Sequence, residues 1–280
     1  MAIITISRGS MELGQGLAAQ LAATLGCPCI EREIIVEAAQ KMGVSQDLMV
    51  KKLEQVPSFW QRLTSERKAY MLAMQAVLAE HVLQGDFVYH SWAGHMLLRE
   101  IPVLRIRIIA PLDIRVPLVM ERQQLNREQA LALVLKLDED RARWTRFIYG
   151  IDWTDPLHYD AVLNLATMNV DAACDAVVAM ARRPDFSLQR ARDKLESFAV
   201  AARARLALAL HPATRILDLE VKADKGVVTV YCVAEQTAIS ASVERALENE
   251  LRTVVTGIGG VKEVKLTIRP VPAISGHPNR

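Results

Sequence analysis

Ala2-Ile3-Ile4-Thr5-Ile6 is followed without a break by Ser7-Arg8-Gly9-Ser10-Met11-Glu12-Leu13-Gly14-Gln15-Gly16. The first segment predicts a buried strand, the second a glycine-rich turn, and the helical periodicity of residues 14–25 predicts a helix. Backbone N–H groups in such a turn, together with the dipole of the helix that follows, hold anions. The sequence therefore predicts a phosphate-binding loop formed by Arg8, Gly9, Ser10, Gly14, Gln15 and Gly16.

The glycine spacing of this loop matches the P-loop, but the two positions after it do not. Gly9 and Gly14 are separated as in G-x-x-x-x-G, whereas Gln15 stands where lysine is expected and Gly16 where serine or threonine is expected. The lysine would add a charge beside the β- and γ-phosphates, and the hydroxyl would bind Mg²⁺. The sequence predicts the frame of a nucleotide kinase that lacks two of its usual side chains.

Composition limits the classes of protein to which this chain can belong. At 280 residues it exceeds one average domain, so a large and a small domain are expected. Hydrophobic residues make up 51% and charged residues 24%, which is typical of a globular protein with a substantial core. The formal net charge of +2 provides no general attraction to nucleic acid, and no nucleic-acid partner is expected.

The cysteines and the first residues of the chain bear on its location. Cys27, Cys29, Cys174 and Cys232 are scattered, and Cys27-Pro28-Cys29 is shorter than the C-x-x-C spacing of redox and zinc motifs. We expect reduced, buried, structural thiols and predict no metal site. No apolar run is long enough for a membrane span, and the first residues lack the pattern of a signal peptide. A cytoplasmic location is therefore expected.

The order of the predicted elements indicates two domains. Strands and helices alternate as far as residue 181, which predicts an α/β fold with a parallel sheet covered by helices. The charged, proline-containing segment 184–194 is a predicted linker. Beyond it the pattern predicts helix 193–210, strand 216–223, turn Asp224-Lys225-Gly226, strand 227–233, helix 237–256 and strand 261–268. The expected domains are 1–183 and a small α+β (αββαβ) domain at 195–270, followed by a disordered tail at 271–280.

Several stretches of the first region resemble the cytidylate-kinase-like family, a branch of the P-loop nucleoside monophosphate kinases. Besides the glycine-rich loop they are Cys29-Ile30-Glu31-Arg32-Glu33-Ile34-Ile35, Val88-Tyr89-His90-Ser91-Trp92-Ala93-Gly94-His95, and a distal block that includes Arg105-Ile106-Arg107-Ile108-Ile109-Ala110-Pro111 and Tyr149-Gly150-Ile151-Asp152-Trp153-Thr154-Asp155-Pro156. The resemblance covers about residues 1–181. It implies a P-loop kinase-like sheet, a nucleotide or nucleoside monophosphate substrate, and ATP with Mg²⁺.

The second region resembles a BON domain, a module associated with phospholipid or membrane surfaces. The resemblance rests on Leu219-Glu220-Val221, Gly226-Val227-Val228-Thr229-Val230 and Gly257-Ile258-Gly259-Gly260-Val261-Lys262-Glu263-Val264. It implies a membrane-surface or protein partner. The same apolar alternation is what any half-buried sheet requires, so the resemblance describes a fold better than a ligand.

The family resemblance also implies roles for side chains outside the loop. In monophosphate kinases an arginine-bearing lid closes over the phosphates, and helix 137–149 offers Arg141 and Arg146 for this role. The alternative is a solvated helix with Asp–Arg pairs at helical spacing. Arg8 is either a phosphate ligand or a surface arginine.

Relatives often carry a glycine–arginine pair near residues 90–95 that contacts the acceptor nucleotide. This chain has His90 and His95 there and no arginine, so the identity of the acceptor stays open. His90 would bind substrate or transfer a proton, and the alternative is a structural histidine hydrogen-bonded at a strand end.

Three functions are compatible with these features. The first is a nucleotide-binding kinase-like protein that transfers the γ-phosphate of ATP to a nucleoside monophosphate such as CMP. The second is a catalytically degenerate kinase fold that senses a nucleotide or another phosphorylated ligand and reports through the BON-like domain. The third is an adaptor whose second domain docks the first on a membrane surface or a protein partner.

Overall fold

The computed structural model describes residues 2–8, 11–54, 65–91, 93–234 and 241–270. The chain divides into two compact units, Met1–Leu195 and Glu196–Arg280. The division falls inside a helix that begins at Arg192. The domain limits inferred from the sequence, 1–183 and 195–270, stay predictions, and the tail at 271–280 lies outside the described residues.

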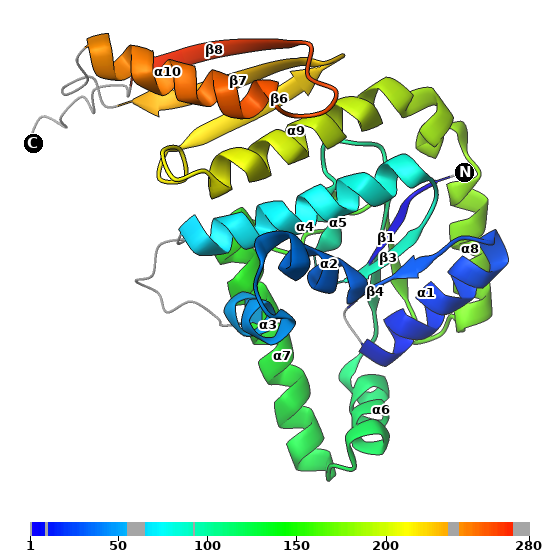
Figure 1. The fold of residues 1–280 in the computed structure, drawn as a ribbon. Helices are drawn as coiled ribbons and strands as arrows, with labels where there is room; N and C mark the ends of the chain where they lie inside the picture. Colours follow the sequence, from blue (N-terminus) through cyan, green and yellow to red (C-terminus); the bar gives the residue numbers. More distant parts are fainter. Residues whose placement is uncertain (1, 9–10, 55–64, 92, 235–240, 271–280) are drawn as a thin grey trace, which may run out of the picture. The chain divides into compact units, whose positions relative to one another are not determined.

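A five-stranded sheet forms the centre of the first unit (Figure 1). Its strands are β1 (Ile4–Arg8), β2 (Cys29–Ile30), β3 (Val88–Ser91), β4 (Leu104–Ile109) and β5 (Ala161–Asn164). They lie in the order β2-β3-β1-β4-β5, and every neighbouring pair is parallel. The predicted α/β fold with a P-loop kinase-like parallel sheet and flanking helices is confirmed.

The helices of this unit connect successive strands and cover the sheet. They are α1 (Met11–Leu25), α2 (Glu33–Met42), α3 (Gln46–Glu54), α4 (Ser65–Gln84), α5 (Gly94–Leu97), α6 (Leu112–Gln123), α7 (Arg127–Tyr149) and α8 (Val170–Ala181), with short 3-10 helices at Pro156–His158, Pro184–Phe186 and Leu188–Ala191. Asn126 and Gln129 form a reciprocal capping box at the start of α7. The Asn169 side chain accepts a hydrogen bond from the Ala172 amide at the start of α8. These caps explain why α7 begins at Arg127 and α8 at Val170.

Alternation along β1 separates an apolar face of the sheet from a polar one. Ile4 and Ile6 point into the main core, which α1 and α8 cover (Figure 1). Thr5 and Ser7 point to the opposite face, and the register pairs Ser7 with Arg107 of β4. Polar side chains from the two central strands therefore share one side of the sheet.

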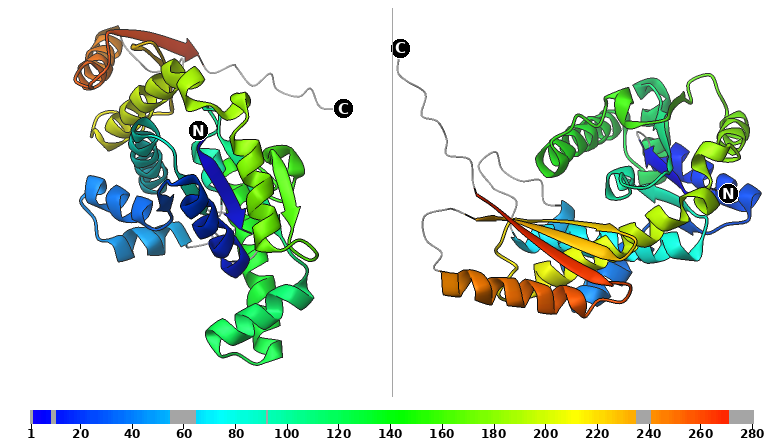
Figure 2. Two further views of the ribbon diagram at one scale, coloured as in Figure 1. Left: turned by 90° about the vertical axis from the view of Figure 1, so that its right-hand side faces the viewer. Right: turned by 90° about the horizontal axis from the view of Figure 1, so that it is seen from above.

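Helices α6 and α7 form a hairpin with an apolar cluster of its own. The cluster is built from Val116 and Val119 of α6 and from Ala130 and Val134 of α7. Figures 1 and 2 show the two helices side by side, projecting from the sheet. The hairpin is therefore held together by contacts that are separate from the main core.

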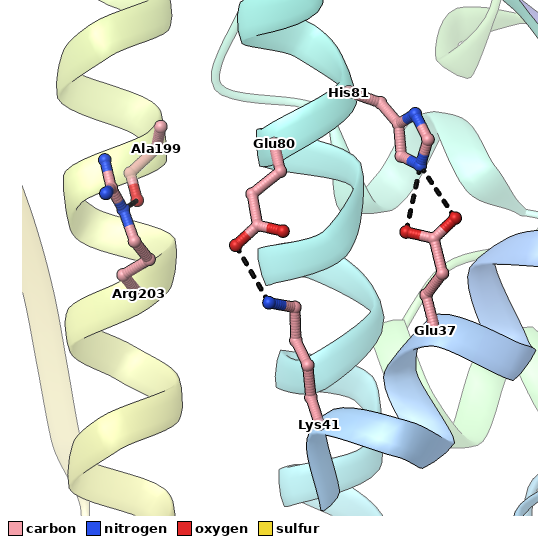
Figure 3. Close-up of polar contacts among 6 residues, drawn as sticks. All are labelled: Glu37, Lys41, Glu80, His81, Ala199 and Arg203. Carbon is pink, nitrogen blue, oxygen red and sulfur yellow. Dashed lines mark hydrogen bonds and ion pairs between the residues drawn. The ribbon is translucent and has the colours of Figure 1, made fainter.

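Two ion pairs join α2 to α4 (Figure 3). Lys41 Nζ lies 2.9 Å from Glu80 Oε1, and His81 Nε2 lies 3.2 and 3.1 Å from the two carboxylate oxygens of Glu37. Partly exposed pairs of this kind each contribute about 0–1 kcal/mol. They orient α2, whose first turn follows the carboxyl end of β2.

The second unit is a three-stranded sheet with two helices. Its elements are α9 (Arg192–Leu210), β6 (Leu219–Asp224), β7 (Val227–Ala234), α10 (Ala241–Thr256) and β8 (Glu263–Pro270). The strands lie in the order β6-β7-β8, antiparallel and then parallel. Residues of α9, α10 and all three strands meet in one apolar core. The predicted αββαβ order is confirmed, and Figure 2 shows α10 running along the sheet.

The hairpin of this unit follows the turn that the sequence predicts. Asp224 pairs with Val227, and both residues between them have positive φ, 48° at Lys225 and 89° at Gly226. Positive φ at both positions is the type I′ turn that matches strand twist. The strand before it was expected at 216–223 but begins at Leu219, because the chain after α9 first forms a turn in which Thr214 Oγ1 donates to the Leu208 carbonyl at 2.6 Å.

Arginine side chains donate hydrogen bonds to one backbone carbonyl on each outer strand of the small sheet. Arg205 of α9 donates from Nε and Nη2 to Val221 of β6, at 3.1 and 2.8 Å. Arg252 of α10 donates from Nη1 to Val264 of β8 at 3.0 Å. A further arginine of α9, Arg203, donates instead to the Ala199 carbonyl of its own helix at 3.2 Å (Figure 3). A strand carbonyl that already accepts a hydrogen bond from an arginine is less available for pairing with a strand of another chain.

The cysteines depart in part from expectation. All four thiols are free, and Cys174 and Cys232 are buried as predicted. Cys29 is exposed, which is a correction: in β2 it alternates with Ile30, and Ile30 is the side chain that enters the core. No helix in the described ranges combines the length and apolar character needed to cross a membrane.

Gly94 provides a test of packing between β3 and α5. Its amide donates to Ser91 Oγ at 2.7 Å, and an added Cβ would overlap the Tyr89 ring and the Ser91 hydroxyl. We expect Gly94→Ala to lower the free energy of unfolding by about 1–3 kcal/mol or more. Gly16→Ala is the matched control, because a Cβ there meets no described atom within 4 Å and Ala is favoured in a helix by about 1 kcal/mol. Urea denaturation of both variants measures the difference; equal stabilities would contradict the packing argument.

Candidate functional site

The strand order locates the candidate site at the carboxyl end of β1. Connections run from β1 toward β2 and β3 on one side and toward β4 and β5 on the other. In open parallel sheets, ligands bind in the crevice outside the carboxyl ends of the strands where the order reverses. Residues that follow or end β1, β3 and β4 are therefore the candidates for binding and catalysis.

Helix α1 begins earlier than the sequence suggests. It starts at Met11, so Gly14, Gln15 and Gly16 lie inside the helix, with Gln15 exposed. Met11, Glu12 and Leu13 are strong helix formers, which accounts for the earlier start. The N–H groups of the first turn have no intrahelical partner.

This start changes how a phosphate would be held. The amides from Gly14 onward bond within the helix, so only those of residues 11–13 remain as helical donors. Arg8 ends β1, and Gly9 and Ser10 lie outside the described residues. The predicted phosphate cradle at 9–16 is therefore shorter at its carboxyl side than the glycine spacing implies.

His90 ends up beside a carboxylate on the β2 side of the site. It is 1% exposed, and its Nδ1 lies 3.5 Å from Glu31 Oε1, just after β2. The Glu31 amide in turn donates to Glu33 Oε2 at 2.7 Å. The pair is located near the carboxyl ends of β2 and β3, next to the start of α2, and the role of His90 at the acceptor side stays a prediction.

The structure separates the two histidines that lie close in sequence. His90 is in register with Ile6, so it belongs to the face of the main core. His95 lies on α5 at the other face, where its ring is 4.9 Å from that of Tyr159. No described residue gives either ring nitrogen of His95 a hydrogen bond, although the side chain is only 3% exposed. The two histidines therefore do not form one site.

Arg107 is at the centre of an aromatic cluster on the polar face. Its guanidinium lies 4.6 Å from the Trp153 ring centroid and 5.7 Å from that of Tyr159, and it donates to the Thr154 carbonyl at 2.5 Å. The Tyr159 hydroxyl donates to the Trp153 carbonyl at 2.8 Å and lies 3.4 Å from Ser7 Oγ. These contacts link β1, β4 and the segment before β5.

The electrostatics of this cluster extend to α7. Burial lowers the pKa of Arg107, and the nearby Tyr159, Asp152 and Asp138 oppose that shift. The pKa of Asp152 is lowered mainly by hydrogen bonds from Thr154, with Arg146 and Arg107 adding to the effect. The charges of Arg107 and Arg146 thus both favour the ionised form of Asp152.

The predicted lid arginines occupy different environments. Arg141 is 4% exposed, and its Nη1 lies 3.6 Å from Asp138 Oδ1. Asp138 also accepts two hydrogen bonds from Arg115 of α6, at 2.7 and 2.8 Å. Arg146 is exposed on α7. Arg143 fits the alternative of a solvated helix with acid–arginine pairs, because it is exposed and pairs with Glu139 at 2.5 Å. Arg141 does not fit it, because its side chain is buried.

Sequence reasoning missed the partners that come from separate elements. Arg115 and Asp138 are 23 residues apart, and Ser7 and Tyr159 are 152 apart. One signal was available for Arg107: a charged residue alternating with isoleucines in a strand must face a polar environment. Nothing in the local sequence indicates that Asp138 bridges two arginines.

The described residues provide little for a protein-held metal ion. No group of three or more His, Cys, Asp or Glu side chains in the described ranges is close enough to bind one. Mg²⁺ usually keeps several waters and is held by one or two carboxylates together with substrate phosphates.

A family model described as the cytidylate kinase-like family matches residues 3–167, which is more than half of the chain. The chain belongs to the cytidylate kinase-like family. The matched range contains the parallel sheet, the α6–α7 hairpin and all the site residues described above. The second unit lies outside the match, and its likeness to a BON domain remains an expectation.

Comparisons with individual proteins agree with this family. A cytidylate kinase from Sulfolobus acidocaldarius is 27% identical over 101 residues, which cover 36% of this chain and 55% of that protein. The chain thus spans about half the length of this curated relative. An uncharacterized protein from Eubacterium ventriosum has a similar fold, with a TM-score of 0.51 and 21% identity over 64% of this chain and 97% of that one.

Shikimate kinase from Acinetobacter baumannii aligns over 64% of this chain and 92% of its own at 12% identity. Its TM-score of 0.37 is too low to support an argument.

Burial of His95 predicts a pH dependence of stability. Desolvation, with Arg105 and His158 adding to it, lowers the pKa of His95 from 6.5 to about 3. Between these values the unfolded chain binds a proton that the folded chain does not, so stability falls as the pH drops, by up to about 1.4 kcal/mol per pH unit. Urea denaturation at pH 7.5 and 5 should show a smaller pH slope for His95→Gln than for wild type. Equal slopes would contradict a neutral, buried His95.

Proposed function

We propose that the protein is a nucleotide kinase that transfers the γ-phosphate of ATP to a nucleoside monophosphate, with CMP as the leading acceptor. One observation carries the proposal: Arg107 lies on β4 beside β1, where the strand order reverses, and Arg115 and Arg141 share a carboxylate on the hairpin that follows β4. The free amides of the first turn of α1 lie beyond the strand at that reversal. Membership of the cytidylate kinase-like family supports the choice of acceptor.

The residues divide into donor and acceptor sides. We assign the donor phosphates to the segment from Arg8 to Gly16, where the amides of residues 11–13 are the helical donors, and to Arg141 and Arg146 of α7. Phosphoryl transfer spreads negative charge over the transferring group, and preorganised cations stabilise it. His90, beside Glu31, is assigned to the acceptor side because it lies one residue before the end of β3. Mg²⁺ bound to ATP would neutralise phosphate charge.

A coupled assay with ATP–Mg²⁺ and each nucleoside monophosphate tests the proposal. We expect turnover with CMP to exceed that with the other monophosphates. Arg141→Ala should reduce turnover by about 10²-fold or more, since it removes a cation next to the phosphates. Absence of turnover with every monophosphate would overturn the catalytic assignment.

A second function is favoured by the two departures in the glycine loop. Gln15 is exposed in α1 and carries no charge, and Gly16 offers no hydroxyl for Mg²⁺. A kinase fold without these groups can bind nucleotide or another phosphorylated ligand without transferring phosphate, and act as a sensor. Calorimetry that detects ATP binding, together with no turnover in the coupled assay, would support the sensor.

Gln15→Lys tests whether the start of α1 holds the donor. The side chain is exposed and, because Cβ bonds tilt toward the helix N-terminus, it reaches toward the free amides. We expect the added charge to tighten ATP–Mg²⁺ binding by about threefold to tenfold in calorimetry. Gln20→Lys, farther along α1, is the control and should leave the affinity unchanged. Unchanged affinity for Gln15→Lys would argue against this location of the phosphates.

For the second unit we propose a BON-like module that binds a protein partner. On the exposed side of its sheet, Lys222 lies 2.8 Å from Glu220 and Lys265 lies 3.7 Å from Glu263. Paired lysines give little net attraction to anionic lipid, where a lysine or arginine near the surface contributes about 1 kcal/mol. The full chain should therefore not float with anionic vesicles; flotation would favour the membrane-surface alternative.

A further inference from the structure

We infer that Asp138 is a positioning residue that holds Arg115 and Arg141 in place for the phosphates of the bound nucleotide. The inference rests on the proposed function, because it assigns a ligand to the same end of the sheet. It concerns a carboxylate that the resemblance to kinases does not single out. Four observations support it: the contact geometry, the burial, the local charge and the location within the hairpin.

The contacts of Asp138 fix two guanidinium groups from different helices. Arg115 Nη1 donates to one carboxylate oxygen at 2.7 Å, and Nη2 donates to the other at 2.8 Å. This two-point contact fixes the plane of the Arg115 guanidinium as well as its distance. Arg141, one turn along α7 from Asp138, approaches the same carboxylate at 3.6 Å. One acidic side chain therefore sets the orientation of both cations.

Burial makes these contacts energetically significant. The side chains of Arg115, Asp138 and Arg141 are 13%, 30% and 4% exposed. Removing one partner from a group of charges with this little exposure leaves the others uncompensated. Without the carboxylate, two guanidinium groups would repel each other at close range, and Arg115 would turn toward water.

The local charge fits a phosphate group. Arg115 and Arg141 both contact the Asp138 carboxylate, and the charge of Asp138 also acts on the more distant Arg107. Arg115, Arg141 and Asp138 together carry one net positive charge, which attracts an anion. A terminal phosphate of a nucleotide carries about two negative charges near pH 7. Arg115 donates through two of its five N–H groups to Asp138, so the others can reach an anion while the carboxylate stays bound.

The location within the hairpin separates this role from simple cohesion of the helices. The apolar cluster of Val116, Val119, Ala130 and Val134 already joins α6 to α7. Asp138 lies one turn beyond Val134, and Arg115 immediately precedes Val116. The charged group is thus at the end of the hairpin that follows β4, on the side of the site. A hairpin that only needed to stay closed would not require it.

The test compares variants of the full chain by calorimetry with tripolyphosphate and with ATP–Mg²⁺. Asp138→Asn keeps the shape of the side chain and removes its charge. We expect it to weaken binding of both probes about tenfold, because the two arginines lose their fixed orientation. Asp138→Glu restores the carboxylate and should recover most of the affinity. Glu139→Gln, which removes the exposed partner of Arg143, is the charge-matched control and should bind as wild type does.

A second control distinguishes positioning from loss of stability. Val134→Ala opens a cavity in the apolar cluster of the hairpin and lowers stability without touching the arginines. It should retain wild-type affinity for tripolyphosphate, whereas Asp138→Asn should not, even where their melting temperatures fall equally. If Asp138→Asn does not fold, Arg115→Lys keeps the charge, loses the two-point contact and should weaken binding likewise.

The outcomes separate this inference from the proposed function. If wild type binds ATP–Mg²⁺ and Asp138→Asn binds it equally well or more tightly, the positioning role is wrong and the kinase proposal stands. Tighter binding would mean that the carboxylate competes with phosphate for the arginines. If wild type binds neither probe, the proposed function fails, and the role of Asp138 fails with it.

Discussion

The placement of β1 between two parallel neighbours is the constraint on which the first unit depends. Its residues pair with β3 on one side and β4 on the other, so its side chains must alternate between two covered faces. Ile4 and Ile6 enter the core beneath α1 and α8, and Ser7 joins the polar face with Arg107. The strand thereby fixes both the main core and the direction in which the site residues point.

The polar face shows how a buried sheet accommodates charge. Arg107 is retained there because aromatic rings of Trp153 and Tyr159 contact its guanidinium and a backbone carbonyl accepts from it. Asp138 and Asp152 add negative charge nearby. Cations next to the reversal of strand order, held by rings and carboxylates, form an environment suited to a phosphorylated ligand.

The second unit obeys different constraints from the first. A type I′ turn fixes the register of β6 and β7, and the register determines which side chains enter the core shared with α9 and α10. Its outer strands each have a carbonyl bound by an arginine. The exposed side of its sheet carries the ion pairs Lys222–Glu220 and Lys265–Glu263.

By itself the sequence determined the parallel sheet and the turn at Lys225–Gly226, because periodicity and turn residues act over a few neighbouring residues. Tertiary structure alone decided that His90 and His95 lie on opposite faces, that α1 begins at Met11, and that Asp138 bridges Arg115 and Arg141. These features depend on packing between elements far apart in the chain. Local sequence patterns do not specify which residues of distant elements come into contact.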